Sequence, residues 1–342
     1  MTVVESPFGK MPDGAPVGRF RLDDGEGVTV DVIGFGCRIT SVRCPDRHGR
    51  SAEVALGFDR LDPYLRDENY FGPVCGRYCN RLGSAEIDLD GRKYVLSAND
   101  DSGPNTLHGG PFGLSNVLWR VRSIDGQAVQ FEHTSPHLHG GFPGNLTTIA
   151  TYSLEKTALH IRYSAVTDAP TVANLTQHLY LNLAGAGTAD VLDHELTIAA
   201  DEYTPFDQDE IPTGEIAPVA GTPFDFRSPR ALGDRIRQVP GGYDHNFVIR
   251  SRGSFAEVAR LTHAPTGRSV VLEADQPGLQ LYTANRLDGS IHGVGGAFVR
   301  HGGVVLEPQH FPDSPHHPNF PSTRLNPGET LMTSLVFHFG VV

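Results

Sequence analysis

Hydrophobic and polar residues alternate in segments spread along the whole chain. Leu159, Ile161, Tyr163 and Ala165 alternate with polar or small residues, and residues 331–339 repeat the pattern near the C-terminus. In a strand, successive side chains point to opposite faces, so strict alternation places the hydrophobic set on one face. Each of these segments therefore predicts a half-buried strand of an antiparallel sheet.

Two further segments show the pattern of β-hairpins. Residues 86–96 alternate on both sides of Asp90-Gly91, and residues 117–131 do so around Asp125-Gly126. Glycine adopts positive φ without steric cost, which is what a tight hairpin turn requires. These pairs predict strands that are neighbours in the sheet.

Helical patterns are few. Ser228-Pro229 followed by Ala231, Leu232 and Ile236 predicts one short amphipathic helix with an N-cap, and residues 61–70 predict another turn or two. The 39 Gly and 25 Pro among 342 residues interrupt longer helices. With no linker or repeat along the chain, residues 1–342 are predicted to form one all-β domain, a large antiparallel β-sandwich with very few short helices.

Composition limits the classes of molecule that the protein is expected to bind. Lys and Arg number 28 against 40 Asp and Glu, a net charge of −12, which argues against nucleic acid and against an anionic membrane surface. A neutral or cationic small molecule fits better. The start of the chain lacks a basic segment followed by an apolar one, and no apolar run approaches the ~20 residues of a membrane span. A cytoplasmic protein is expected.

The four cysteines, Cys37, Cys44, Cys75 and Cys79, have no zinc-ribbon spacing. Free thiols in a reducing compartment are therefore expected.

One polar strand face is the first candidate for chemistry. If residues 174–183 form a strand, every second side chain lies on one face, and each is polar or amphipathic. Buried polar groups without partners cost about 1–3 kcal/mol each, so water or a polyhydroxylated ligand is expected to satisfy them. The five are Asn174, Thr176, His178, Tyr180 and Asn182.

Glu307 is the second candidate. It follows the apolar run 304–306, and Pro308 after it is expected to prevent further pairing, so the carboxylate is placed at the end of a buried strand. Partial burial there would raise its pKa toward the range of a general base. A solvated glutamate at a strand end is the alternative.

Three other segments hold polar groups suited to hydroxyl partners. His108 precedes Gly109-Gly110, where a ligand could approach the backbone closely, although an incidental turn is the alternative. Asp244 either binds a ligand or simply turns the chain. Gln280 and Tyr282 are predicted to share one strand face.

The sequence gives little support for a metal-binding or nucleotide-binding site. His137 and His139 could share a strand face, but the surrounding Pro and Gly residues predict a loop, and no cysteine or carboxylate completes a known spacing with His133, His316 or His317. The sequence lacks a phosphate-binding Walker motif, a dinucleotide-binding glycine motif and a serine-hydrolase elbow. No metal or other cofactor is expected.

Taken together, these segments resemble the aldose 1-epimerases, or galactose mutarotases. The resemblance extends over about 300 residues, with the motifs in the family's order. They are Pro45 to Gly49, Leu56 to Asp59, Gly76 to Arg81, Asn105 to Gly110, Gly141 to Gly144, Asn174 to Leu183, Gly242 to His245, Gly278 to Tyr282 and Leu306 to Ser314.

The resemblance implies a galactose mutarotase-like β-sandwich whose open groove holds a free monosaccharide. It implies that His178 is the general acid at the ring oxygen, that Glu307 is the general base at the anomeric hydroxyl, and that His108 assists near the ring oxygen. Sugar hydroxyls would be anchored by Arg81 and Asp244, with Asn80, Gln280 and Gln309 as neighbours. Exchange of protons between these groups and the sugar needs no metal or nucleotide.

Two departures from the family pattern concern substrate preference. The family commonly has Asn-His-Ser-Tyr-Phe-Asn where this chain has residues 177–182, and acidic residues where His137 and His139 stand. A hexose such as galactose or glucose is expected as substrate, with a pentose such as arabinose or xylose as the alternative. A non-catalytic sugar-binding module and a metal-dependent sugar enzyme also remain open, as do a monomer and a homodimer.

Overall fold

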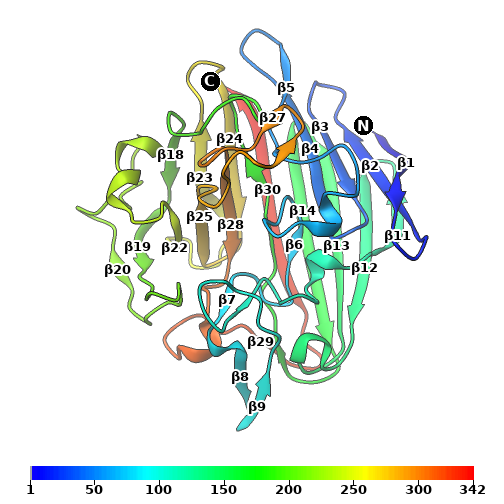
Figure 1. The fold of residues 1–342 in the computed structure, drawn as a ribbon, viewed down its shortest axis with the longest axis vertical. Helices are drawn as coiled ribbons and strands as arrows, with labels where there is room; N and C mark the ends of the chain where they lie inside the picture. Colours follow the sequence, from blue (N-terminus) through cyan, green and yellow to red (C-terminus); the bar gives the residue numbers. More distant parts are fainter. Residues whose placement is uncertain (1) are drawn as a thin grey trace.

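The structure, a computed structural model, describes residues 2–342 and is built from antiparallel strands (Figure 1). Three large sheets contain most of the strand residues. The first is formed by the N-terminal segment in sequence order. Its strands are β1 (Thr2–Lys10), β2 (Pro16–Asp23), β3 (Thr29–Ile33), β4 (Arg38–Pro45) and β5 (Ser51–Glu53).

The second sheet has nine strands and combines the middle of the chain with its C-terminal segment. The C-terminal strand β30 lies between β14 and β24, in the interior of this sheet (red in Figure 1). In spatial order the strands are β11 (Arg120–Asp125), β12 (Ala128–Ser135), β13 (Leu146–Glu155), β14 (Ala158–Thr167), β30 (Leu331–Val341), β24 (Arg268–Ala274), β23 (Ala256–Thr262), β18 (Glu195–Ile198) and β21 (Arg230–Ala231).

The third sheet has six strands and carries the residues that concern function. In spatial order they are β17 (Tyr180–Leu181), β28 (Val304–Gln309), β25 (Gly278–Tyr282), β22 (Asp244–Ile249), β19 (Ala200–Thr204) and β20 (Ala217–Pro218). Inward-facing side chains of all three sheets meet in one hydrophobic core. The all-β sandwich is confirmed.

Short elements connect the large sheets. The two-stranded pairs are β6 (Val74–Cys75) with β16 (Thr176–Gln177), β7 (Arg81–Leu82) with β10 (Thr106–Leu107), β8 (Glu86–Leu89) with β9 (Arg92–Val95), β15 (Thr171–Val172) with β29 (Arg324–Leu325), and β26 (His292–Gly293) with β27 (Gly296–Ala297). The 3-10 turns are η1 (Tyr64–Arg66), η2 (Gly83–Ala85), η3 (Leu114–Asn116), η4 (His139–Gly141), η5 (Leu232–Asp234), η6 (Ile236–Gln238) and η7 (Ser314–His316). Within residues 2–342, no helix has the length and apolar character to span a bilayer.

The alternating segments form strands as predicted. In β14, Ile161, Tyr163 and Ala165 are buried while their neighbours are more exposed. Both hairpins are present, β8 with β9 and β11 with β12, although β11 begins at Arg120 rather than near residue 117. The turn expected within residues 61–70 is η1.

The helix predicted after Ser228-Pro229 is wrong. Residues 230–231 pair with β18 as a short strand, and only two 3-10 turns follow. The backbone N–H groups of Leu232 and Gly233 donate to the carbonyls of His194 and Leu192 instead of to carbonyls one turn back. Pairing with the sheet edge therefore uses the donors that a helix would need.

Candidate active site

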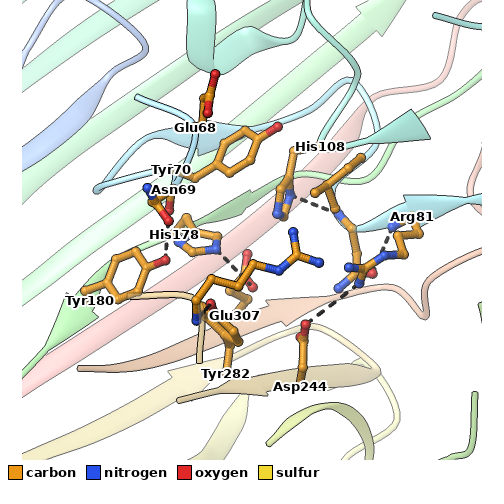
Figure 2. A pocket seen from close by; sticks show the side chains of 13 residues that line it. Glu68, Asn69, Tyr70, Arg81, His108, His178, Tyr180, Asp244, Tyr282 and Glu307 are labelled. Atoms are coloured by element: carbon orange, nitrogen blue, oxygen red, sulfur yellow. Dashed lines mark hydrogen bonds and ion pairs between the residues drawn. The ribbon is translucent and has the colours of Figure 1, made fainter. Parts of the chain in front are cut away.

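A pocket opens over the six-stranded sheet, and side chains from distant parts of the chain converge on it (Figure 2). Glu307 comes from β28, Asp244 and Tyr282 come from β22 and β25, and His178 comes from the link between β16 and β17. The lining residues are Glu68, Asn69, Tyr70, Asn80, Arg81, Leu107, His108, His178, Tyr180, Asp244, Tyr282, Arg286 and Glu307.

Glu307 lies within β28, and not at a strand end as the sequence predicted. The strand continues through Pro308, which is in register with Leu279 of β25, to Gln309. Proline is tolerated there because the strand on the other side, β17, pairs only with Val304 and Val305. Glu307 is therefore held by a regular ladder, with its side chain 2% exposed.

Cross-strand register places a row of polar groups beside Glu307. Gln280 of β25 is opposite Glu307, and Asn246 of β22 is opposite Gln280. Directly opposed residues share one face of an antiparallel sheet. The next row on that face holds Asp244 and Tyr282. The pleat of three strands thus presents a polar face to the pocket.

The expected single strand over residues 174–183 is interrupted, and its polar groups have different partners. Asn174 and Asn182 donate to backbone carbonyls, so no ligand is needed to satisfy their amides. His178 and Tyr180 line the pocket, and the Tyr180 hydroxyl donates to the Asn69 carbonyl at 2.8 Å. The expectation that water or a polyhydroxylated ligand satisfies these groups is therefore wrong for Asn174 and Asn182. It stays a prediction for His178, whose Nδ1 has no partner among the described residues.

His108 is fixed by its backbone as well as by its ring. It has a left-handed φ of 52°, and its Nδ1 accepts a hydrogen bond from the Asn80 N–H at 3.1 Å. Because Nδ1 is the acceptor, the proton of the neutral ring is on Nε2. The ring lies edge-on to His178, with centroids 5.3 Å apart, and both histidines point into the pocket (Figure 2).

Gly109 is needed for a close backbone contact within the protein rather than for a ligand. A Cβ at Gly109 would lie 2.1 Å from the Gly76 carbonyl oxygen, and its φ is 86°. The glycine after His108 is therefore required by the neighbouring chain segment. The expectation that a ligand approaches the backbone at this point is corrected accordingly.

Burial shifts the protonation of both groups on the pocket floor toward their neutral forms. His178 Nε2 lies 3.9 Å from Glu307 Oε2. Burial lowers the pKa of His178 to about 3. Burial, reinforced by Asp244 and opposed by Arg81, raises the pKa of Glu307 well above its usual range. Burial also lowers the pKa of His108, with smaller contributions from His178 and Arg81.

Two buried atoms of this pair have no hydrogen-bond partner among the described residues, His178 Nδ1 and Glu307 Oε1. Buried polar atoms in folded proteins are nearly always paired, and exceptions are common at functional sites. Their side chains line the pocket, which makes the pair a candidate for binding a polar ligand and for exchanging protons with it.

Arg81 is surrounded by carboxylates. Its Nε lies 2.8 Å from Asp100 Oδ2, its Nη2 contacts Glu210, and its Nη1 lies 3.8 Å from Asp244 Oδ2. Gln280 in turn donates to Asp244 Oδ1 at 2.7 Å. Arg81 can still donate from Nη1, and Asp244 can accept, so the two are suited to neutral hydroxyl groups.

The structure brings most of the predicted site residues together. Of the eight, Asn80, Arg81, His108, His178, Asp244 and Glu307 line the pocket. Gln280 lies behind Asp244, and Gln309 is fully buried next to Cys79 and Gln280, so these two support the lining rather than form it.

One wall of the pocket had no sequence signal. It is the loop with Glu68, Asn69 and Tyr70, and the Tyr70 ring lies 4.5 Å from that of His108. The sequence predicted only a helical turn in this region, because a loop wall has no periodicity. The Tyr70 backbone has a left-handed φ of 57°, a conformation that cannot be predicted from a tyrosine in the sequence.

That loop is anchored by a buried ion pair. Arg38 Nη1 lies 2.5 Å from Asp67 Oδ2, and both side chains are at most 1% exposed. Asp67 also accepts the N–H groups of Asn69 and Phe71, while Arg38 donates to the Phe71 carbonyl. The pair fixes the ends of the segment that carries Tyr70.

Metal-ligating residue types gather at two places within residues 2–342. One group is Cys75, His108 and Glu307, and the other is Asp193, His194 and His263. His137 and His139 belong to neither group. They lie in the loop after β12, as predicted, where His137 Nδ1 accepts the Gly144 N–H at 2.9 Å.

The cysteines are as expected from their spacing. All four are free and buried.

Comparison with known proteins identifies the family. The family model for aldose 1-epimerase matches residues 18–338. Galactose mutarotase of Sus scrofa is 42% identical over 344 residues, covering 100% of this chain and 99% of the relative. Aldose 1-epimerase of Escherichia coli is 34% identical over 337 residues, covering 96% of each.

Solved structures show the same fold. A GalM/aldose epimerase homologue from C. elegans superposes with a TM-score of 0.88 at 28% identity, covering 95% of this chain and 99% of its own. Galactose 1-epimerase from Lactobacillus acidophilus superposes with a TM-score of 0.87 at 25% identity, covering 100% and 99%. By its sequence over nearly the full length and by its fold, the chain belongs to the aldose 1-epimerase family of carbohydrate isomerases.

Proposed function

We propose that the protein interconverts the α and β anomers of a free aldose, with galactose or glucose as the substrate. The observation that carries this proposal is the buried pair of Glu307 and His178, a carboxylate and an imidazole 3.9 Å apart on the pocket floor. The hydroxyl oxygen and the ring oxygen of an aldose are bonded to the same anomeric carbon. Two groups that reach these oxygens must lie within a few ångströms of each other, as this pair does.

The reaction needs one proton removed and one supplied. The reacting form of the pair has its one proton on His178 and leaves Glu307 as the carboxylate. Glu307 then takes the proton of the anomeric hydroxyl while the bond between the anomeric carbon and the ring oxygen breaks, and His178 gives its proton to the ring oxygen. The product is the open-chain aldehyde. After rotation about the bond from C1 to C2, the ring oxygen attacks the other face, and both protons return to their donors. Atoms and charges balance over the cycle.

The remaining groups hold the sugar in place. Asp244 and Arg81, which line the pocket, bind ring hydroxyls, while His108 lies beside His178 with its Nε2–H free to donate. Tyr70, Tyr180 and Tyr282 contribute ring surface to the pocket, which suits the apolar faces of a pyranose. Positioning of this kind lowers the entropy cost of reaching the reactive geometry.

Polarimetry tests the proposed activity. Fresh α-galactose, α-glucose, arabinose and xylose are mixed with the protein, and the approach to anomeric equilibrium is compared with buffer alone. Acceleration that is greatest for a hexose is expected. A pentose optimum would instead assign a pentose mutarotase. Binding of hexose in calorimetry without any acceleration would contradict the proposal and identify a sugar-binding module.

The pKa shifts predict the pH dependence. Because the pKa of His178 is lowered to about 3 and that of Glu307 is raised, the pair holds one proton over the range between them. A second proton is gained only toward pH 3, and the single proton is lost as pH rises through the raised pKa of Glu307. For the free enzyme, kcat/KM should therefore be flat above about pH 4 and should fall as pH rises through the raised pKa of Glu307.

The profile is measured by polarimetry after subtraction of the spontaneous rate at each pH. An acid limb near ~6.5, the ordinary pKa of histidine, would show that His178 titrates independently of Glu307 and would contradict the shared proton.

A further inference from the structure

Glu210 lies beside the pocket without lining its floor, and the mechanism above does not use it. Its carboxylate contacts Arg81 Nη2 and lies 3.5 Å from Arg286 Nη2. Arg81 is almost fully buried, whereas Arg286, on the pocket wall, is 47% exposed. One carboxylate thus pairs with both arginines that face the pocket.

The segment carrying Glu210 is held in place independently of these arginines. The Asp209 carbonyl accepts hydrogen bonds from Ser102 and Asn105, and Asp207 Oδ1 accepts the Asp209 and Ile211 N–H groups. Glu210 itself has a left-handed φ of 58°. A non-glycine residue in this conformation persists where the surroundings fix it, and such sites cluster at ligand clamps.

The charges around the pocket are unbalanced toward the negative. Arg81 faces carboxylates at each of its nitrogens, those of Asp100, Glu210 and Asp244, while Arg286 shares Glu210. Glu68 on the wall adds another carboxylate. Hydrogen-bond donors remain for neutral hydroxyls, but the positive charge that would attract an anion is already paired.

We propose that Glu210 determines specificity: by neutralising Arg81 and Arg286, its carboxylate makes the pocket select uncharged aldoses over anionic sugars such as uronic acids. This inference rests on the proposed function, since it names the substrate class of the same site. In physical terms, the carboxylate occupies the place at which a substrate anion would otherwise pair with two guanidinium groups.

The test compares galactose with galacturonic acid, which differs in having a carboxylate in place of the terminal CH₂OH group. We measure kcat/KM for both sugars by polarimetry at neutral pH and take their ratio. In Glu210→Gln the ratio of galacturonate to galactose should rise about tenfold, because one negative charge is removed and Arg286 is released. The gain should shrink at high salt, since exposed charges are screened.

Three further variants separate the effect of charge from a structural effect. Arg286→Gln should lower the ratio, and the double variant Glu210→Gln/Arg286→Gln should return it toward the wild-type value. Glu257→Gln, a change of the same type at a surface ion pair with Arg260, should leave it unchanged. Melting temperatures of all variants establish that each is folded.

An unchanged ratio in Glu210→Gln, or an equal loss for both sugars, overturns the inference and leaves Glu210 as a structural residue. Failure of the wild type to accelerate galactose anomerisation would instead overturn the proposed function. In that case the ratio of the affinities for galacturonate and galactose, measured by calorimetry in wild type and Glu210→Gln, still decides the role of Glu210. Absence of galactose binding would overturn both.

Discussion

Glu307→Gln is expected to lower kcat for anomerisation by about 10²–10⁴-fold, the range that a positioned general base contributes. The amide keeps the shape of the protonated carboxyl group but cannot take the proton of the anomeric hydroxyl. His178→Asn should cause a loss of similar size, because it removes the proton donor to the ring oxygen. Polarimetry with fresh α-galactose measures both.

Unfolding would not explain this loss. The pKa of Glu307 is raised in the folded protein, so between its unfolded value and its folded value the native state binds more protons than the unfolded state. Stability therefore falls as pH rises through this window, by at most ~1.4 kcal/mol per pH unit. Glutamine has no proton to lose, so Glu307→Gln should be as stable as the wild type or more stable at neutral pH.

Matched controls complete the experiment. Glu257→Gln changes a glutamate on the surface, and His160→Asn changes a histidine on the less buried face of β14. Both should retain wild-type rates. Wild-type rates in folded Glu307→Gln and His178→Asn would disprove the assigned acid and base.

Arg38→Met should have the largest effect on stability, a decrease of about 3–5 kcal/mol in the free energy of unfolding. The substitution leaves Asp67 charged and buried, because both side chains of the pair are at most 1% exposed. It also removes the donor to the Phe71 carbonyl, so the Tyr70 loop should loosen and KM should rise. Urea denaturation and polarimetry measure the two effects.

The double variant Arg38→Met/Asp67→Asn distinguishes the two contributions. If the cost comes from the unpaired charge, the double variant should be more stable than Arg38→Met alone. Asp67→Asn keeps an oxygen that can accept one of the N–H groups of Asn69 and Phe71. A loss in the double variant equal to the sum of the single losses would contradict coupling between Arg38 and Asp67.

The sequence predicted strands better than it predicted how they connect. Alternation identified β14, β30 and both hairpins, since a half-buried strand needs one apolar face whatever its partners. It failed after Ser228-Pro229, where an N-cap pattern was overridden by pairing with β18. Local propensity cannot anticipate a sheet edge contributed by a segment more than 30 residues away.

For the site as well, the sequence predicted individual residues but not the contacts between distant segments. His178, Glu307 and His108 were predicted as a set from the family resemblance, and the pocket contains all three. The Tyr70 loop and the paired role of Glu210 were missed, because both depend on contacts between segments without recognisable spacing. Glu307 was placed at a strand end because Pro308 usually stops pairing, and only the short neighbouring strand β17 shows why it does not.

The interior position of β30 has a consequence for biosynthesis. Every residue that lines the pocket precedes residue 308, whereas β30 consists of Leu331–Val341. A nascent chain that ends at residue 330 therefore contains the whole site but leaves β14 and β24 as two unpaired edges. Such edges readily pair with other chains, so aggregation during translation is the hazard that the last strand removes.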